Sequence, residues 1–282
     1  MSGPRVRLVA LDIDGTLLRS DKTLSPRTRE AVARARRGGV RVVLVTGRRH
    51  PSARKVADEL GPALPLVVHN GALVIDEGRI IRCRPLAREV AARAIQLGRA
   101  HGSEPIVHCG KSGEGWLLVE ARAQPEGLVA YYLERARSEL RLVEGLVEAL
   151  AQEDTIQVMF GGTQAEIARL HEALAAELSK VAKLERTVYP AIDFALVDVL
   201  DPSVGKADAL AFLCGRWGIA AEETLAIGDN WNDRQMLERA GRGLLMGNAP
   251  VELIALGLPL LPTNDEDGVA HALETHVIAN SL

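Results

Sequence analysis

Short, largely apolar segments that alternate with helical patterns constrain this chain most. Val6–Leu11, Val40–Val45 and Leu66–Val68 each have the length and the aliphatic side chains of a strand buried on both faces. Ser25-Pro26 resembles an N-cap followed by proline at the first helical position, which predicts a helix to about Arg37. A second helix is predicted from about Pro51 to Leu60. This β-α-β-α-β order predicts a parallel α/β layer structure with right-handed crossovers.

The parallel pattern is interrupted in the middle of the chain. Asp76-Glu77-Gly78 has the composition of a hairpin turn, and the sequence beyond it is less regular. The parallel pattern returns with the apolar segment Thr224–Ile227. We therefore predict an α/β core formed by residues 1–84 and 200–282, with an inserted α+β domain at residues 85–199. The predicted strands of the inserted domain are Trp116–Glu120, Thr155–Phe160 and Phe194–Leu200, and its predicted helices are Ala87–Ala100, Pro125–Arg137 and a segment from Thr163 to about Leu178.

Composition argues against several classes of function. The net charge is −3, and Arg34–Arg41 is best explained as the end of an exposed helix, so no nucleic-acid partner is indicated. No apolar run approaches the roughly 20 residues that cross a bilayer, and the N-terminal residues are too polar for a signal peptide. Cys83, Cys109 and Cys214 are widely spaced, which indicates reduced thiols. We expect a cytoplasmic protein that binds no membrane, and the sequence predicts no particular oligomeric state.

Polar residues follow the apolar segments directly. Asp12 and Asp14 follow the first segment, Thr46-Gly47-Arg48 follows the second, and Gly228-Asp229 follows Thr224–Ile227. The carboxyl ends of parallel strands meet at one edge of a sheet, where ligands bind in α/β proteins. Residues about 180 positions apart in the sequence are therefore expected in one pocket.

Such a pocket would hold four carboxylates, those of Asp12, Asp14, Asp229 and Asp233. Like charges at short range raise one another's pKa, so a cation is needed among them. No histidine or cysteine cluster lies nearby, which argues against zinc, whereas an all-oxygen site suits Mg²⁺. Lys206 supplies a second positive charge. The sequence thus predicts a magnesium site beside groups that can bind phosphate.

Four ordered motifs resemble those of the haloacid dehalogenase (HAD) superfamily. They are LDIDGTLL (Leu11–Leu18), VTGR (Val45–Arg48), Lys206 within DPSVGKADAL, and GDNWND (Gly228–Asp233). Three further stretches resemble its Cof-type phosphatases, which carry a type IIB cap: HNGALV (His69–Val74), MGNAP (Met246–Pro250) and TNDEDGVAHAL (Thr263–Leu273). One departure is Ala207, where a glycine often follows the motif lysine. The resemblance implies a Rossmann-like HAD core with the inserted domain as its cap.

The resemblance also implies a role for each motif residue. Asp12 would be the nucleophile that forms an aspartyl-phosphate, and Asp14 the general acid and base. Asp12 and Asp229 would bind Mg²⁺ directly, Asp14 through its backbone carbonyl, and Asp233 directly or through water. Thr46 and Lys206 would be catalytic residues that also bind the phosphoryl group, together with the N–H groups of Ile13 and Gly47 and with Asn232.

Two residues keep alternative interpretations. Arg48 would contact substrate or face solvent, and Asn70 would contact substrate or simply form a turn with Gly71. As a whole, the chain is expected to be a Mg²⁺-dependent phosphatase acting on a small phosphorylated metabolite. The alternatives are a phosphomutase of the phosphomannomutase type and a non-catalytic phosphate-binding regulatory protein.

Overall fold

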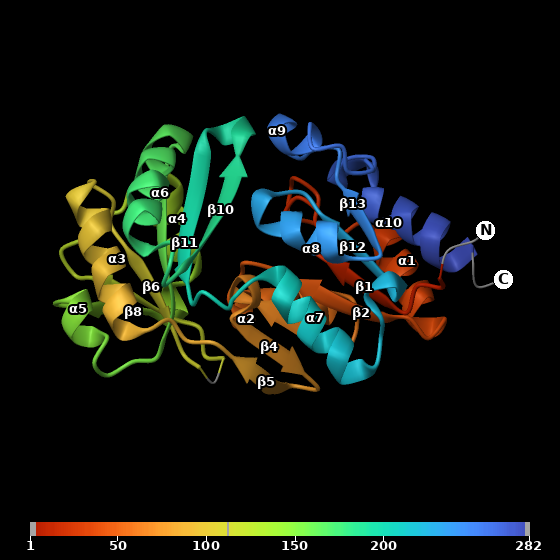
Figure 1. Cartoon of the computed structure of the whole chain (residues 1–282), viewed down its shortest axis with the longest axis horizontal. Coiled ribbons are helices and arrows are strands. Elements are labelled where there is room, and N and C mark those ends of the chain that lie inside the picture. The colour runs from red at the N-terminus through yellow and green to blue at the C-terminus, as the bar shows by residue number, and fades with distance from the viewer. Residues whose placement is uncertain (1–3, 112, 280–282) are drawn as a thin grey trace. The chain divides into compact units, whose positions relative to one another are not determined.

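The chain folds into two compact units. The structure is a computed structural model that describes residues 4–111 and 113–279 (Figure 1). Unit 1 comprises residues 1–81 and 205–282, and unit 2 comprises residues 82–204. The divisions therefore fall after residues 81 and 204, whereas the sequence pattern placed them after residues 84 and 199. Within the described ranges, no helix is long and apolar enough to cross a membrane.

Unit 1 contains a seven-stranded sheet with the order β13-β12-β1-β2-β3-β4-β5. The first five strands of this order run parallel, and β4 is antiparallel to β3. The strands are β1 (Leu8–Leu11), β2 (Arg41–Val45), β3 (Leu66–Val68), β4 (Leu73–Asp76), β5 (Arg79–Cys83), β12 (Thr224–Gly228) and β13 (Arg242–Leu245). The helices are α1 (Pro26–Arg37), α2 (His50–Glu59), α7 (Lys206–Trp217), α8 (Arg234–Arg239), α9 (Val251–Ile254) and α10 (Gly268–Leu273), with single 3₁₀ turns at His69–Gly71, Ala221–Glu223, Trp231–Asp233 and Asn264–Glu266 and a π-helical turn at Glu274–Ile278.

Both faces of the parallel strands are covered, which explains their continuous apolar sequence. Leu8 and Ala10 pack with Leu213 of α7 and Met236 of α8 on one face. On the other face, α1 lies against α10 (Figure 1). The parallel α/β architecture predicted from the sequence is confirmed.

Unit 2 contains a six-stranded sheet with the order β10-β11-β9-β6-β7-β8. Neighbouring strands are antiparallel except β7 and β8, which are parallel. The strands are β6 (Ile106–Cys109), β7 (Trp116–Glu120), β8 (Leu140–Val143), β9 (Thr155–Gly162), β10 (Lys183–Tyr189) and β11 (Phe194–Leu200). The helices are α3 (Arg88–Ala100), α4 (Gly127–Arg135), α5 (Leu146–Ala149) and α6 (Gln164–Leu178), with single turns at Arg137–Glu139 and Pro190–Ile192.

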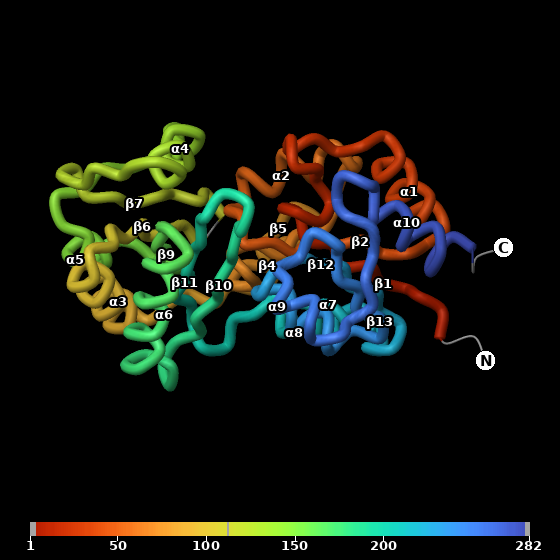
Figure 2. Tube along the Cα trace, turned by 90° about the horizontal axis from the view of Figure 1, so that it is seen from above, coloured from red at the N-terminus to blue at the C-terminus, as the bar shows by residue number. Residues whose placement is uncertain are grey.

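Helices cover both faces of this second sheet. Figure 2 shows α4 on one side of it and α3 with α6 on the other. Consecutive residues of β9 show the alternation: Met159 belongs to the cluster beneath α4, whereas Phe160 lies so close to Gly98 of α3 that a Cβ there would sit 2.0 Å from its ring. The α+β character predicted for the middle of the chain is confirmed.

Local signals in the sequence act where they were expected. The Ser25 side chain accepts a hydrogen bond from the Thr28 N–H, and α1 begins at Pro26, as predicted. The turn between β4 and β5 has Glu77 at φ 49° and Gly78 at φ 73°, the left-handed pair of a type I′ hairpin.

The chain passes between the two units at two places that lie close together. Strand β5 carries the chain out of unit 1, and the segment after β11 brings it back. The Arg82 guanidinium donates to the Ser203 carbonyl at 3.4 Å, so the two ends of unit 2 are neighbours.

Candidate active site

Three strands of unit 1 end level with one another, and their following residues meet at one edge of the sheet. Leu11 pairs with Ile227 of β12 on one side and with Leu44 of β2 on the other. The Asp12 N–H continues this ladder by donating to the Ile227 carbonyl at 3.0 Å. Strand register therefore brings Asp12 beside the segment that carries Asp229.

Lys206 joins two of the carboxylates. It is the first residue of α7, and its ammonium donates to Asp12 Oδ1 and to Asp233 Oδ1, each at 2.6 Å. All three side chains are buried. Burial works to lower the pKa of Lys206, but the charges of the two aspartates raise it above its ordinary value. Lys206 is therefore charged and fixed between the two carboxylates.

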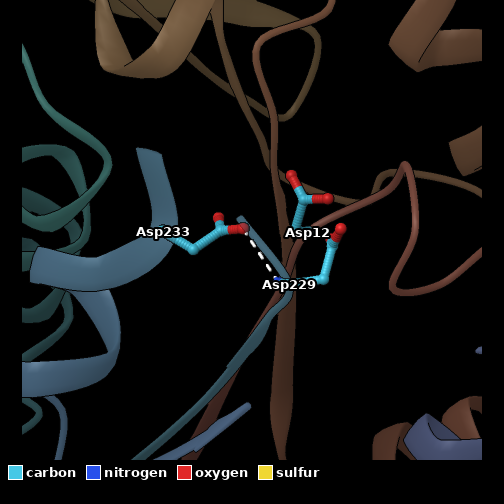
Figure 3. Close-up of side chains that lie close together, drawn as sticks. All are labelled: Asp12, Asp229 and Asp233. Atoms are coloured by element: carbon cyan, nitrogen blue, oxygen red, sulfur yellow. Dashed lines mark hydrogen bonds between the residues drawn. The ribbon is translucent and has the colours of Figure 1, made fainter. Parts of the chain in front are cut away.

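Asp233 and Asp229 are held by further donors. Asp233 Oδ2 accepts a hydrogen bond from the backbone N–H of Asp229 at 3.1 Å (Figure 3) and another from the backbone N–H of Asn230 at 3.1 Å. The Thr16 hydroxyl donates to Asp229 Oδ1 at 2.7 Å. Both oxygens of Asp233 are thus engaged by protein donors, whereas Oδ2 of Asp229 takes no part in these bonds.

The cluster carries more negative than positive charge. Asp12, Asp229 and Asp233 each offer a carboxylate oxygen, and these oxygens lie within 4.8 Å of one another. Burial raises the pKa of Asp12 to about 7, with Lys206 opposing the increase and Asp233 adding to it. Burial and the charges of Asp12 and Asp233 also raise the pKa of Asp229 well above its ordinary value. A hard cation bound by these oxygens would relieve this repulsion, so the donor set fits Mg²⁺.

Two glycines allow the carboxylates to approach the backbone. A Cβ on Gly15, where φ is 81°, would lie 2.3 Å from Asp229 Oδ2. A Cβ on Gly228 would lie 2.5 Å from the Asp233 side chain. Any other residue at these positions would displace the carboxylates, which gives a physical reason for the glycines in DIDGT and GDNWND.

Asp14 lies in a different electrostatic setting from Asp12. Its carboxylate accepts two hydrogen bonds from the Arg48 guanidinium, at 2.6 and 2.8 Å, and one from the Lys22 ammonium at 3.2 Å. Burial works to raise the pKa of Asp14, but the bonds and charges of these two cations lower it to about 2. The structure thus pairs the Arg48 guanidinium with the Asp14 carboxylate. The predicted contact of Arg48 with substrate stays a prediction.

The remaining candidate residues line the same region of unit 1. Thr46 is buried, and its hydroxyl accepts the Arg48 N–H at 3.1 Å. Asn70, at φ 54°, receives a hydrogen bond from the Asn232 amide at 2.9 Å, and both are buried. A Cβ on Gly47 would lie 3.1 Å from the Asn70 side chain. Ile13 is fully buried, and its carbonyl accepts the Leu18 N–H at 2.9 Å.

Sequence reasoning missed three contributors. Thr16 lies inside the first motif, so its place in DIDGT was the available signal, but its bond to Asp229 was not foreseen. Lys22 belongs to none of the motifs. It reaches Asp14 because the chain turns back toward Asp14 at Lys22, where φ is 68°. Asn248, which donates to the Gly15 carbonyl at 2.8 Å, lies in the MGNAP stretch, which was noted without a role.

Comparison with known proteins identifies the class. The family profile of haloacid dehalogenase-like hydrolases matches residues 9–273. The chain therefore belongs to this family. The expected Rossmann-like core and the resemblance to HAD phosphatases are confirmed by its relatives and structural neighbours.

Three proteins illustrate the relationship. Phosphatase YwpJ of Bacillus subtilis is 27% identical over 291 residues, which cover 95% of this chain and 99% of YwpJ. The HMP-PP phosphatase of an Enterobacter species is 30% identical over 273 residues, which cover 96% and 95%. A HAD subclass IIB sugar phosphatase has the same fold, with a TM-score of 0.76, 23% identity and coverage of 95% of this chain and 98% of its own. The chain is accordingly a HAD-like phosphatase, a hydrolase of phosphoric monoesters.

Proposed function

We propose that the protein is a Mg²⁺-dependent phosphatase that hydrolyses a small phosphorylated metabolite through an aspartyl-phosphate on Asp12. The observation that carries this proposal is the Lys206 contact. One buried ammonium binds both Asp12 and Asp233 at 2.6 Å, which fixes the Asp12 carboxylate at the end of β1. A nucleophile needs such fixed orientation because phosphoryl transfer depends mainly on positioning and on neutralising charge.

In the first step, a carboxylate oxygen of Asp12 forms a bond to phosphorus as the bond to the leaving oxygen breaks. Asp14 gives its proton to that oxygen, and the alcohol departs. Lys206 and the Thr46 hydroxyl, both buried, stabilise charge on the transferring group together with the N–H groups of Ile13 and Gly47.

In the second step, Asp14 takes a proton from water, whose oxygen attacks the phosphorus of the aspartyl-phosphate. Inorganic phosphate leaves, and Asp12 and Asp14 return to their starting states. Before the first step Asp14 needs a proton, and the two bonds from Arg48 stabilise its ionised form. The catalytic cycle therefore requires the Asp14–Arg48 contact to loosen when substrate binds.

Asp12 and Asp229 would hold Mg²⁺ directly, with the Asp14 carbonyl as a further ligand. Asp233 would act through water, since both of its oxygens already accept bonds from Lys206 and from backbone N–H groups. When bound, Mg²⁺ supplies charge neutralisation for the phosphate oxygens.

Unit 2 is proposed to be the cap that selects the leaving group and excludes water. The substrate class is inferred from relatives: one is an HMP-PP phosphatase, and another is a 5-amino-6-(5-phospho-D-ribitylamino)uracil phosphatase. Both names denote small phosphorylated molecules. We propose that the reaction takes place in the cytoplasm, because Cys83, Cys109 and Cys214 are free thiols.

The test is turnover of an aryl phosphate with Mg²⁺ by wild-type protein, Asp12→Asn and Asp58→Asn. Asp58 is an exposed partner of Arg54 on α2, so its variant controls for the substitution itself. We expect turnover by wild type and Asp58→Asn, and a loss of at least about 10³-fold for Asp12→Asn. Full activity of Asp12→Asn would refute covalent catalysis. Release of an isomerised sugar phosphate in place of inorganic phosphate would indicate a phosphomutase, and Mg²⁺ binding without any turnover would indicate a regulatory protein.

A further inference from the structure

Asp14 lies on a small hairpin whose shape is set by backbone hydrogen bonds. The hairpin spans residues 13–24, and we call it the Asp14 hairpin. The Leu18 N–H donates to the Ile13 carbonyl at 2.9 Å, and Asp14 itself forms a β-bridge with Leu18. At the tip, the Arg19 N–H donates to the Thr23 carbonyl at 3.0 Å. The position of Leu18 therefore determines the position of Asp14.

A segment near the C-terminus holds this hairpin by its backbone. The Asn264 amide donates to the Leu18 carbonyl at 2.9 Å, and the Asn248 amide donates to the Gly15 carbonyl at 2.8 Å. The two asparagines are also joined, because the Asn264 N–H donates to Asn248 Oδ1 at 3.0 Å. The Leu18 carbonyl thus accepts a hydrogen bond from Asn264, and the Leu18 N–H donates to the carbonyl of Ile13, the residue before Asp14. Two consecutive hydrogen bonds therefore connect Asn264 to the backbone next to Asp14.

Two acidic residues of the same segment accept hydrogen bonds from the tip of the hairpin. Asp265 accepts hydrogen bonds from the Ser20 N–H at 2.9 Å and from the Ser20 hydroxyl at 2.7 Å. Asp267 accepts one from the Arg19 guanidinium at 2.9 Å. We call Asn248, Asn264, Asp265 and Asp267 the C-terminal clasp.

The clasp is itself fixed to the metal side of the site. The Met246 N–H donates to the carbonyl of Gly228, the residue before Asp229, at 3.0 Å. Asn264 is buried in a turn closed by reciprocal bonds between Thr263 and Glu266. The clasp therefore links the hairpin that carries Asp14 to the strand end that carries Asp229.

We propose that Asn248 and Asn264 are positioning residues that set the general acid Asp14 relative to the carboxylate cluster. This inference rests on the proposed function, in which Asp14 protonates the leaving group. It gives a role to the MGNAP and TNDEDG stretches, which supply no group to the chemistry itself. Without the clasp, Leu18 and Gly15 lose their donors, and the backbone that carries Asp14 is no longer fixed to the strand end that carries Asp229.

The test compares leaving groups, because only a basic leaving group needs a proton from Asp14. The variant Asn264→Asp keeps the shape of the side chain but replaces the N–H donor facing the Leu18 carbonyl. Asn248→Ala is a second variant at an exposed position, where we expect the substitution to leave the fold intact. The values of kcat/KM are measured for p-nitrophenyl phosphate and for an alkyl phosphate, since kcat/KM covers the steps up to leaving-group departure.

We expect each variant to lose about 10-fold or more in kcat/KM with the alkyl phosphate and less than about 3-fold with the aryl phosphate. Asp14→Asn should show the same pattern with larger losses, which provides the reference. Glu274→Gln, which weakens an exposed contact between Glu274 and Arg27 in the same C-terminal region, is the control and should change neither value.

Equal losses with both substrates, or no loss with either, would overturn the positioning role and leave the clasp as a stabilising contact. These outcomes are distinct from failure of the proposed function. Full activity of Asp12→Asn, or an Asp14→Asn protein without leaving-group discrimination, would refute the chemistry whatever the clasp variants show. Thermal unfolding of each variant separates loss of positioning from loss of folded protein.

Discussion

Each unit contains a buried ionic cluster, and the two clusters differ in charge balance. In unit 1, the ammonium of Lys206 faces the carboxylates of Asp12 and Asp233, with Asp229 close by. In unit 2, the buried carboxylate of Glu120 accepts hydrogen bonds from Arg99, from Arg122 at 2.8 Å and from the Leu146 N–H at 3.1 Å. One cluster has an excess of negative charge, whereas the other pairs a single carboxylate with two guanidinium groups and a backbone N–H.

This difference distinguishes a site built for chemistry from a contact built for stability. Burial and the neighbouring carboxylates raise the pKa of Asp12 and of Asp229, so the cluster contains electrostatic repulsion that a bound cation would relieve. Glu120 has a lowered pKa, because the bonds from Leu146, Arg122 and Arg99 outweigh the effect of burial. Folding therefore favours the charged form of Glu120. The unit 1 cluster, in contrast, would be stabilised most by a bound cation.

Replacing Lys206 is expected to have the largest effect. Lys206→Met fills a similar volume but leaves Asp12 and Asp233 buried without their shared cation, at a cost of about 3–5 kcal/mol in unfolding free energy. Activity should be lost as well. Arg99→Met is the matched change in unit 2, and it should cost far less because Arg122 and Leu146 still bind Glu120. Urea unfolding measures both, and equal costs would contradict the comparison.

Magnesium is expected to stabilise the protein through unit 1. At a free concentration of 100 times its Kd, an ion that binds only the folded state adds about 2.7 kcal/mol. Asp229→Asn should remove most of this increase, while Glu120→Gln should retain it. Thermal unfolding with Mg²⁺ and with EDTA provides the measurement. An identical increase in wild type and Asp229→Asn would place the ion elsewhere.

Glu120→Gln is expected to destabilise unit 2 without removing activity. The variant loses the charge that both arginines bind and turns an amide donor toward one of them, at a cost of about 1–3 kcal/mol. Arg122 is largely exposed and can return to solvent, which keeps the cost at this level. Chemical denaturation gives the energy, and aryl phosphate turnover should stay within about 3-fold of wild type. A severe loss of turnover would show that Glu120 serves the reaction.

Acidification is expected to produce the smallest effect, and it probes the same carboxylate. The pKa of Glu120 is lower in the folded protein than its ordinary value of 4.5. Its stabilisation is therefore complete above about pH 4.5 and is lost as the pH falls toward the folded-state pKa. The difference in unfolding free energy between wild type and Glu120→Gln should shrink over this range. A constant difference down to about pH 3 would contradict the lowered pKa.

The sequence predicts the two sheets unequally, for a physical reason. The central strands of unit 1 are buried on both faces, so their apolar runs are visible in the sequence. In unit 2, the edge strands β8 and β10 were not predicted, and neither was β6, a buried strand of four residues inside the sheet. Strand β10 reads KLERTVY, with charged residues where an edge strand meets solvent, and β8 is only four residues long. Edge strands are defined by pairing with a neighbour, which local patterns do not reveal.

The candidate site divides in a similar way. The approach of Asp12 to Asp229 follows from parallel strands that end level, and the sequence order of apolar segments is enough to predict it. The hydrogen-bond partner of each side chain, in contrast, cannot be predicted from the order of the apolar segments. That Arg48 binds Asp14, and that Asn264 binds the Leu18 carbonyl, depends on turns separated by up to about 250 residues. Such pairings require the folded backbone.

The contact between Arg82 and Ser203 has a consequence for how this architecture can change. The two ends of unit 2 are neighbours, so unit 2 is an insertion into unit 1 that begins and ends at adjacent points. A gene segment encoding residues 82–204 could be exchanged for another whose ends lie equally close, without altering the strand order of the remaining sheet. Since unit 2 is proposed to select the leaving group, new substrate preferences could then be acquired by recombination at two sites, while the carboxylate cluster of unit 1 stays unchanged.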